Sequence, residues 1–197
     1  MCNPREKSRA WSHPSAAITA PARPRIWLAL GANVPGPWGS PASALVRALR
    51  ELEMAGLTVS RRSSIYRTAP VGLLSQPDFL NAVIGLEGSI GPAALLRLAK
   101  RLERAAGRRP GQRNGPRPLD VDLLDFDGRR IGKPASRREV GRLLLPHPEL
   151  NRRDFVLVPL AEASARPPRA VIATRAQAAL RLNPRARRGV HRLGPLG

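Results

Sequence analysis

The sequence predicts a single α+β domain whose elements follow in the order strand, helix, strand, strand, helix, strand. This prediction depends on segments with strand-like alternation or short apolar runs, which are separated by two segments whose leucines recur at helical spacing. The chain has 197 residues, 42% of them hydrophobic, so it can bury one sizeable core. No apolar run approaches the roughly 18 residues that a membrane-spanning helix needs.

The first half of the chain predicts a strand, a helix and a second strand. Residues 25–30 form an apolar run that ends at a Gly-Ala-Asn turn, which indicates a buried strand. Ser40 supplies an N-cap before a first-turn proline, leucines follow at near-helical spacing, and Gly56 ends the helix. Residues 57–66 alternate with β-branched residues and predict one strand, and a loop over residues 67–78 follows.

The second half of this pattern repeats the strand and the helix. Residues 79–87 alternate as in a half-buried strand, and Gly91 opens an amphipathic helix that closes near Gly107. An arginine-rich loop leads to a further strand, which ends at a hairpin turn signal, Asp127 followed by Gly128. The resulting β-α-β-β-α-β order is the split βαβ arrangement of ferredoxin-like folds.

The remainder of the chain predicts additional C-terminal elements. Residues 152–160 are apolar enough for a closing helix or strand, and residues 171–182 form one possible short helix in a Pro/Arg-rich stretch. We therefore expect three regions: a disordered basic extension over residues 1–24, one folded domain over 25–165, and a basic Arg/Pro-rich tail over 166–197.

The formal charge of +20 invites a nucleic-acid interpretation, but its distribution argues against one. Residues 166–197 carry eight arginines and no acid, and the 31 arginines against 3 lysines are also typical of a GC-rich genome. Aromatic residues make up only 4% of the chain, so the stacking platforms of single-strand binders are scarce. We therefore expect no specific nucleic-acid partner, although basic tails could bind nucleic acid nonspecifically.

Cysteine content and the N-terminal segment indicate the compartment. Cys2 is the only cysteine, so the chain cannot form an internal disulfide. Prolines interrupt the first 24 residues and no apolar signal region follows, which argues against secretion. We expect a cytoplasmic, monomeric protein without a membrane partner.

Two carboxylates, Asp120 and Asp122, directly follow two arginines, Arg113 and Arg117. On a strand, residues i and i+2 point to the same face, so both carboxylates can hold hard cations such as Mg²⁺. Arginine forks suit phosphate oxygens, and the segment therefore predicts a site for polyphosphate chemistry. A solvated face with surface ion pairs explains this short motif equally well, so the rest of the chain has to decide.

Four separated blocks, taken together and in order, resemble the 6-hydroxymethyl-7,8-dihydropterin pyrophosphokinase family of folate biosynthesis. The blocks are residues 66–72 with 76–81, residues 100–103 with 107–108, residues 113–124, and residues 146–148 with Arg153 and Phe155. The resemblance extends from about residue 26 to residue 160. It implies an ATP-dependent diphosphotransferase that moves pyrophosphate from ATP to 6-hydroxymethyl-7,8-dihydropterin and releases AMP.

The resemblance also implies a role for individual residues. For the pterin, it implies contacts from Thr68, Pro70, Val71, Phe79, Asn81 and Phe155. For ATP, it implies Lys100, Glu103, Arg113, His147 and Arg153. Two Mg²⁺ ions would bind Asp120 and Asp122, with Arg108, Arg117 and Asp122 acting in catalysis. The chain departs from some members by having Lys100 in place of glutamine and Asn114 in place of tryptophan.

Each of these residues also has a structural interpretation. Asn81 could satisfy a backbone group at a strand start, and Phe155 could belong to the core. His147 could be an ordinary loop residue. The alternative interpretation of Glu103 is that it is an exposed carboxylate at a helix end, paired with Arg97 or Arg104.

Two other functions compete with the enzyme. A basic RNA-binding protein with a ferredoxin-like core would explain the charge but not the two aspartates, which repel phosphate without a metal. A homologue with lost or altered chemistry is the second, because of Lys100 and Asn114. The length of the chain leaves no room for a fused second folate enzyme, so we expect one activity.

Overall fold

The computed structural model describes residues 26–109, 114–132, 143–165, 171–182 and 189–197. In chain order the elements are β1 (Ile26–Ala32), α1 (Pro41–Met54), β2 (Thr58–Arg62), β3 (Ser64–Thr68), β4 (Phe79–Glu87), α2 (Pro92–Ala105), β5 (Asp120–Phe126), the 3-10 turn η1 (Leu150–Arg152), α3 (Asp154–Ala163), α4 (Val171–Leu182) and β6 (Val190–Pro195). The expected extension over residues 1–24 lies outside the described residues, as does Arg113.

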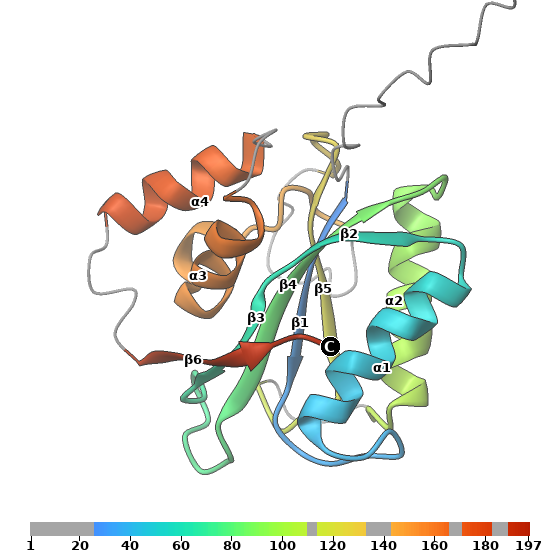
Figure 1. Ribbon diagram of the computed structural model, residues 1–197, viewed down its shortest axis with the longest axis vertical. Helices are drawn as coiled ribbons and strands as arrows, with labels where there is room; N and C mark the ends of the chain where they lie inside the picture. Colours follow the sequence, from blue (N-terminus) through green and yellow to red (C-terminus); the bar gives the residue numbers. More distant parts are fainter. Residues whose placement is uncertain (1–25, 110–113, 133–142, 166–170, 183–188) are drawn as a thin grey trace, which may run out of the picture.

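The strands form one antiparallel sheet in the order β5-β1-β4-β3-β6, and β2 also pairs with β4 (Figure 1). Helices α1 and α2 lie on one side of the sheet, and α3 and α4 lie on the other. The protein is therefore an α+β fold built on a single sheet, as the alternation of helical and strand patterns predicted.

Alternation along the strands builds a separate apolar core on each face of the sheet. On β1, Leu28 and Leu30 belong to the core beneath α1 and α2, whereas Trp27 belongs to the core beneath α3 and α4. The larger core also takes leucines from both helices, including Leu45, Leu49, Leu52, Leu95, Leu98 and Leu102. None of the helices in the described ranges is long and apolar enough to cross a membrane.

The helix boundaries follow the predicted signals. Ser40 caps α1, where its hydroxyl accepts a hydrogen bond from the backbone N–H of Ser43 at 3.2 Å. Gly56 follows the helix with φ of +83°, a conformation in which glycine has no Cβ to strain. Helix α2 begins with Pro92 at its first position and ends before Gly107, as expected.

The single strand predicted over residues 57–66 is wrong in one respect, because it divides into β2 and β3 at Ser63. The backbone N–H of Ser63 donates to the carbonyl of Val83 (2.9 Å), and its hydroxyl accepts from the Val83 N–H (2.9 Å). The serine thereby satisfies both backbone groups of Val83, so the chain can bend there without leaving buried polar atoms unpaired. The following loop starts later than predicted, since Arg67 and Thr68 belong to β3.

The hairpin expected at Asp127 and Gly128 is only half correct. Both residues have positive φ, +55° and +69°, and the Arg129 N–H donates to the Phe126 carbonyl at 2.9 Å, so the tight turn forms. Within the described residues, however, no second strand follows. Ile131 instead makes one isolated bridge with Leu145.

The C-terminal region differs most from the expected tail. Residues 154–163 form the helix of the two alternatives left open, and α4 occupies the predicted 171–182. Strand β6 was not predicted, and it pairs with β3 along the edge of the sheet. Leu196 is fully buried in the larger core. The packed structure therefore continues beyond residue 165, because β3 presents an unpaired edge that β6 satisfies.

Candidate active site

A cleft of about 470 Å³ lies on the sheet face that α3 covers only in part. The floor comes from three adjacent strands, where Gly31 of β1 lies opposite both Asn81 of β4 and Asp120 of β5. Residues paired across antiparallel strands point to the same face, so these side chains share the cleft. Ala29 and Gly31 are small, which leaves the space open between the strands and the beginning of α3.

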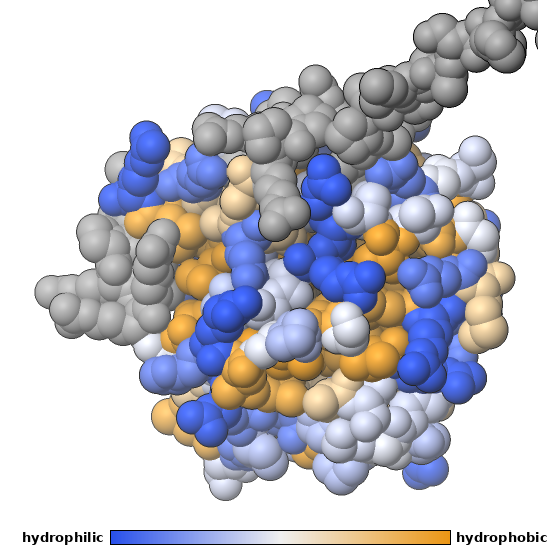
Figure 2. All heavy atoms as spheres, viewed as in Figure 1, coloured by the Kyte–Doolittle hydropathy of each residue, from blue (hydrophilic) through white to orange (hydrophobic). Residues whose placement is uncertain are grey.

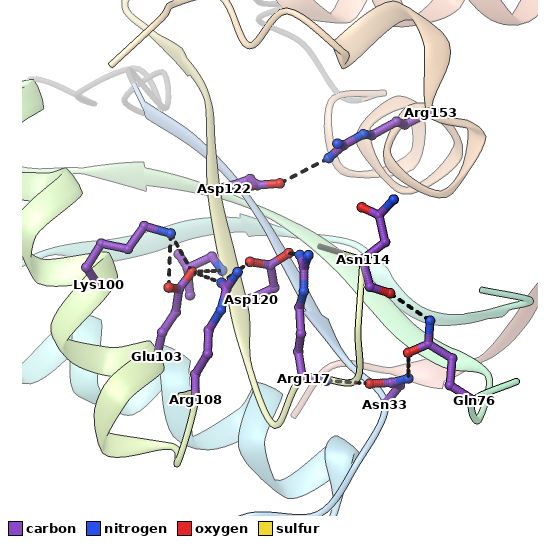
Figure 3. A network of polar contacts seen from close by, with 11 residues as sticks. Asn33, Gln76, Lys100, Glu103, Arg108, Asn114, Arg117, Asp120, Asp122 and Arg153 are labelled. Atoms are coloured by element: carbon purple, nitrogen blue, oxygen red, sulfur yellow. Dashed lines mark hydrogen bonds and ion pairs between the residues drawn. The ribbon is translucent and has the colours of Figure 1, made fainter. Parts of the chain in front are cut away.

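The two aspartates share the predicted face of β5. Asp120 and Asp122 both line the cleft, and Val121 between them is buried in the opposite core. The guanidinium groups of Arg108 and Arg117 both contact the Asp120 carboxylate (Figure 3). Arg153 donates to the Asp122 carboxylate at 3.3 Å. Both carboxylates are thus in ion pairs with arginines, and they lie in a cleft instead of on an open strand face.

The two carboxylates differ in their electrostatic environment. Burial opposes ionisation of Asp120, but the nearby guanidinium groups of Arg108 and Arg117 outweigh it and lower its pKa. Burial raises the pKa of Asp122, and the negative charge of Asp120 raises it further. The cleft thus holds one well-neutralised carboxylate and one that lacks sufficient positive charge nearby.

Glu103 anchors the end of α2 to β5 from beneath the aspartates. Its side chain is only 3% exposed, accepts from Lys100 Nζ (2.9 Å) and the Val121 N–H (2.9 Å), and makes an ion pair with Arg108 Nη1 at 2.7 Å. Burial raises its pKa despite these donors. The expected alternative, an exposed carboxylate paired with Arg97 or Arg104, is therefore wrong.

His147 lies beside β5, where its backbone N–H donates to the Leu124 carbonyl at 2.9 Å. Its Nδ1 accepts from the Glu149 N–H at 3.2 Å, so the neutral ring carries its proton on Nε2. Burial lowers the pKa of His147, although the nearby Asp122 opposes this shift. The imidazole is therefore a neutral donor near the carboxylate that is less well neutralised.

The other side of the cleft is flatter and less charged. Asn81 Nδ2 donates to Thr68 Oγ1 at 2.8 Å, which leaves the Asn81 carbonyl oxygen facing Gly31 across the cleft floor. Phe79 and Phe155 line the same cleft, and the Arg153 guanidinium carbon lies 5.7 Å from the centre of the Phe155 ring. Amide, hydroxyl and aromatic groups are thus gathered where a flat polar ring could bind.

Two residues that the sequence analysis missed hold the loops around the cleft. Asn33 Nδ2 donates to Gln76 Oε1 (3.0 Å) and to the Pro77 carbonyl (3.1 Å), and its Oδ1 accepts from the Arg117 N–H (2.7 Å). Gln76 Nε2 in turn donates to the Asn114 carbonyl at 2.8 Å (Figure 3). The signal in the sequence was an asparagine directly after a buried strand, a position that also fits an ordinary turn residue.

The structure brings together most of the predicted site residues. Those lining the cleft are Thr68, Val71, Phe79, Asn81, Arg117, Asp120, Asp122, Arg153 and Phe155. The cleft lining does not include Pro70, Lys100, Glu103, Arg108 or His147, although Arg108 contacts Asp120 directly. Gly31 and Asn33 complete the site from β1 and the residue that follows it.

Carboxylates and arginines at one end of the cleft, with amide and aromatic groups at the other, are the features of an enzyme that transfers a phosphate-containing group to a flat ring. Comparison with known proteins agrees with this class and specifies it. The chain belongs to the 7,8-dihydro-6-hydroxymethylpterin-pyrophosphokinase family, whose model matches residues 27–165. Members of this family are ATP-dependent diphosphotransferases.

Individual relatives support this membership. A 2-amino-4-hydroxy-6-hydroxymethyldihydropteridine pyrophosphokinase of Methylorubrum extorquens is 38% identical over 139 residues, covering 70% of this chain and 81% of that protein. The protein of the same name from Bacillus subtilis is 39% identical over 137 residues, covering 69% of this chain and 75% of its own. A mitochondrial folate synthesis bifunctional protein of Arabidopsis thaliana is 39% identical over 137 residues, 70% of this chain. The match spans only 23% of that plant protein.

Proposed function

We propose that this protein transfers the pyrophosphate group of ATP to the hydroxymethyl group of 6-hydroxymethyl-7,8-dihydropterin and releases AMP. The observation that carries the proposal is the shared cleft. Asp120, Asp122, Arg117 and Arg153 line one part of it, and Asn81 lies on the same floor, opposite Gly31. A phosphate chain and a flat ring can therefore meet within one enclosed space.

The part of the cleft that we assign to the phosphates is formed by arginines, each of which pairs with a carboxylate in this structure. Arg108 and Arg117 both contact Asp120, and Arg153 contacts Asp122, so each guanidinium already points toward the cleft floor. Like a carboxylate, each phosphate of a triphosphate offers these forks two oxygen atoms that can accept a bidentate pair of hydrogen bonds. We assign Arg108, Arg117 and Arg153 to the phosphates and His147 to an ATP oxygen. Lys100 and Glu103 support this side through their contact with Arg108.

The residues present fit Mg²⁺. Asp120 and Asp122 provide hard oxygen ligands on one strand face, and both carboxylates line the cleft. Two carboxylates suit an ion whose other ligands are water and phosphate oxygens. Bound there, Mg²⁺ would neutralise phosphate charge and favour attack on phosphorus. We propose two such ions. Within the described residues, no group of three or more Asp, Glu, His or Cys side chains could form an all-protein site.

The pterin side follows from hydrogen-bonding capacity and shape. Asn81 and Thr68 offer a donor, acceptors and a hydroxyl to the edge of the ring, and Phe79 and Phe155 offer aromatic faces. Val71 is 67% exposed on the loop at the cleft rim, where a bound ring would cover it. We include Pro70, on the same loop, as a backbone contact.

The proposed reaction requires positioning above all. The hydroxymethyl oxygen attacks the β-phosphorus in line, the bond from that phosphorus to the α,β-bridging oxygen breaks, and AMP leaves with that oxygen. We assign Asp122 to accept the hydroxyl proton, because its carboxylate lines the cleft beside Asp120 and Arg153. The guanidinium groups stabilise the charge that spreads over the transferring phosphates, and the cleft aligns the two substrates.

Further features complete the proposal. Strand order β5-β1-β4-β3 with α1 and α2 on one face supports the ferredoxin-like topology.

We keep the cytoplasm as the proposed location because Cys2 is the only cysteine, and a monomer as the proposed state. Strongly hydrophilic residues are scattered among hydrophobic groups on the face shown in Figure 2, which gives no support to a nucleic-acid surface there.

The test is AMP release from ATP and Mg²⁺, measured with and without 6-hydroxymethyl-7,8-dihydropterin. We expect one AMP for each pterin consumed and none without the pterin. ADP in place of AMP would contradict pyrophosphate transfer. Absence of pterin-dependent turnover by the folded protein would favour the altered homologue.

A further inference from the structure

The start of α3 bears on the proposed pterin site, where the contact of Arg153 with Asp122 ties it to the cleft floor. Asp154, Phe155 and Val156 in its first turn line the cleft, and Arg153 caps the helix. The far end of the same helix carries Glu162, seven residues after Phe155 and therefore on the same side of the helix, about two turns away. Any force that fixes Glu162 therefore also sets the position of Phe155.

Glu162 is held by four donors from two strands. It accepts from the Ser64 N–H (2.7 Å), the Ser64 hydroxyl (2.9 Å), the Tyr66 hydroxyl (3.1 Å) and Arg192 Nε (3.4 Å). Arg192 Nε also donates to the Ser64 hydroxyl at 2.8 Å, which closes a triangle between α3, β3 and β6. Burial opposes ionisation of Glu162, but the hydrogen bonds from Ser64 and Tyr66 outweigh it and lower its pKa, so the carboxylate is charged at neutral pH.

Strand β6, which provides Arg192, is fixed at both ends. At its start Val190 pairs with Thr68, the β3 residue that lines the cleft. Beyond its end, Arg62 Nη1 donates to the carbonyl oxygens of Leu196 (3.2 Å) and Gly197 (2.8 Å), and Leu196 is buried. The family match ends at residue 165, so this strand lies outside the matched region. It braces β3 on one side of the cleft and α3 on the other.

We propose that β6 is a positioning element for the pterin side of the cleft, acting through the contact of Arg192 with Glu162 and Ser64. Its action is to hold Phe155 on α3 at a fixed distance from Thr68 on β3. This inference rests on the proposed function. Arg108 and Arg117 come from elements that this triangle does not contact, whereas Arg153 caps α3, so Arg153 is the one proposed phosphate contact that the brace can reach.

The test compares Arg192→Ala and Glu162→Gln in the full chain with Arg47→Ala. Arg47 makes an exposed ion pair with Glu51 at 2.6 Å on α1, across the sheet, so it is a matched loss of an Arg–Glu pair. We expect a KM for the pterin about threefold to tenfold higher in both test variants, the equivalent of one hydrogen bond. The KM for ATP should rise less, because only Arg153 of the proposed phosphate contacts lies at α3. Arg192→Lys, which keeps a cation and a donor, should recover part of the loss.

Hydrogen exchange of the α3 amides provides a readout that does not need turnover. We expect faster exchange over residues 154–163 in Arg192→Ala and no change there in Arg47→Ala. Exchange changes confined to β6, or an unchanged pterin KM in an active enzyme, would overturn the positioning role. If the unaltered protein releases no pterin-dependent AMP, the proposed function fails, and slower or unchanged α3 exchange in Arg192→Ala would separately refute the brace.

Discussion

Replacing Gly31 perturbs the ring side of the cleft while every proposed contact residue keeps its own side chain. A Cβ at this position would lie 3.2 Å from Asn81 Oδ1 and 3.9 Å from the Asp120 Cβ. The first contact is tighter than ordinary van der Waals packing, so Gly31→Ala should displace the Asn81 amide by a few tenths of an ångström. The second contact is ordinary, so the aspartate should stay in place.

The expected magnitude follows from one weakened hydrogen bond. Misalignment of a neutral hydrogen bond costs about 0.5–1.5 kcal/mol, which corresponds to about a two- to tenfold increase in the KM for the pterin. The KM for ATP should change little. Stability should fall by no more than about 1 kcal/mol, because alanine recovers part of the crowding cost through its lower backbone entropy.

Steady-state kinetics with each substrate varied in turn would check this, together with urea unfolding. Gly91→Ala is the matched control, since a Cβ on that glycine at the start of α2 would meet no atom within 4 Å. A pterin KM that is unchanged in Gly31→Ala would refute the assignment of Asn81 to the ring. An equal rise in the control would show that the effect is not specific to the cleft.

The remaining predictions concern carboxylates. Asp120→Asn and Asp122→Asn should each lower kcat at least about 100-fold at saturating Mg²⁺, and near-normal turnover in both would remove the metal assignment. Glu103→Gln should lose about 1–3 kcal/mol in urea unfolding, because Lys100 and Arg108 lose the charge of their buried partner; a more stable variant would contradict the anchoring role. The lowered pKa of Glu162 means that its stabilisation is present above the ordinary glutamate value of about 4.3 and is lost as pH falls through the folded value. Unfolding at several pH values should therefore show the gap between the unaltered protein and Glu162→Gln closing in acid, and a gap independent of pH would be inconsistent with this.

The predictable part of the fold came from local signals. Ser40 with the proline that follows it, and Gly56, marked the limits of α1, because capping and positive φ depend on few neighbouring residues. The break at Ser63 was not predictable in this way. It depends on hydrogen bonds to Val83, which is twenty residues away, and nothing in the alternation of residues 57–66 reveals that partner.

The candidate site likewise has one part that local sequence signals predict and another that depends on tertiary packing. The i, i+2 spacing of Asp120 and Asp122 determined that they share a face, since side-chain direction alternates along any strand. Which cations meet them was decided only by packing, because Arg153 arrives on the cap of α3 and Arg108 follows α2. The network of Asn33 and Gln76 is likewise a contact between loops, 43 residues apart in the chain.

The sequence by itself determined the element order, the two helices, the paired aspartates and the family. Tertiary structure alone decided that Glu103 is buried, that the C-terminal region continues the sheet, and that Gly31 lies beneath the cleft between Asn81 and Asp120. The physical reason is the range of the interactions. Periodicity, caps and turns are set within a few residues, whereas burial and strand-edge pairing depend on which distant segments the folded chain brings together.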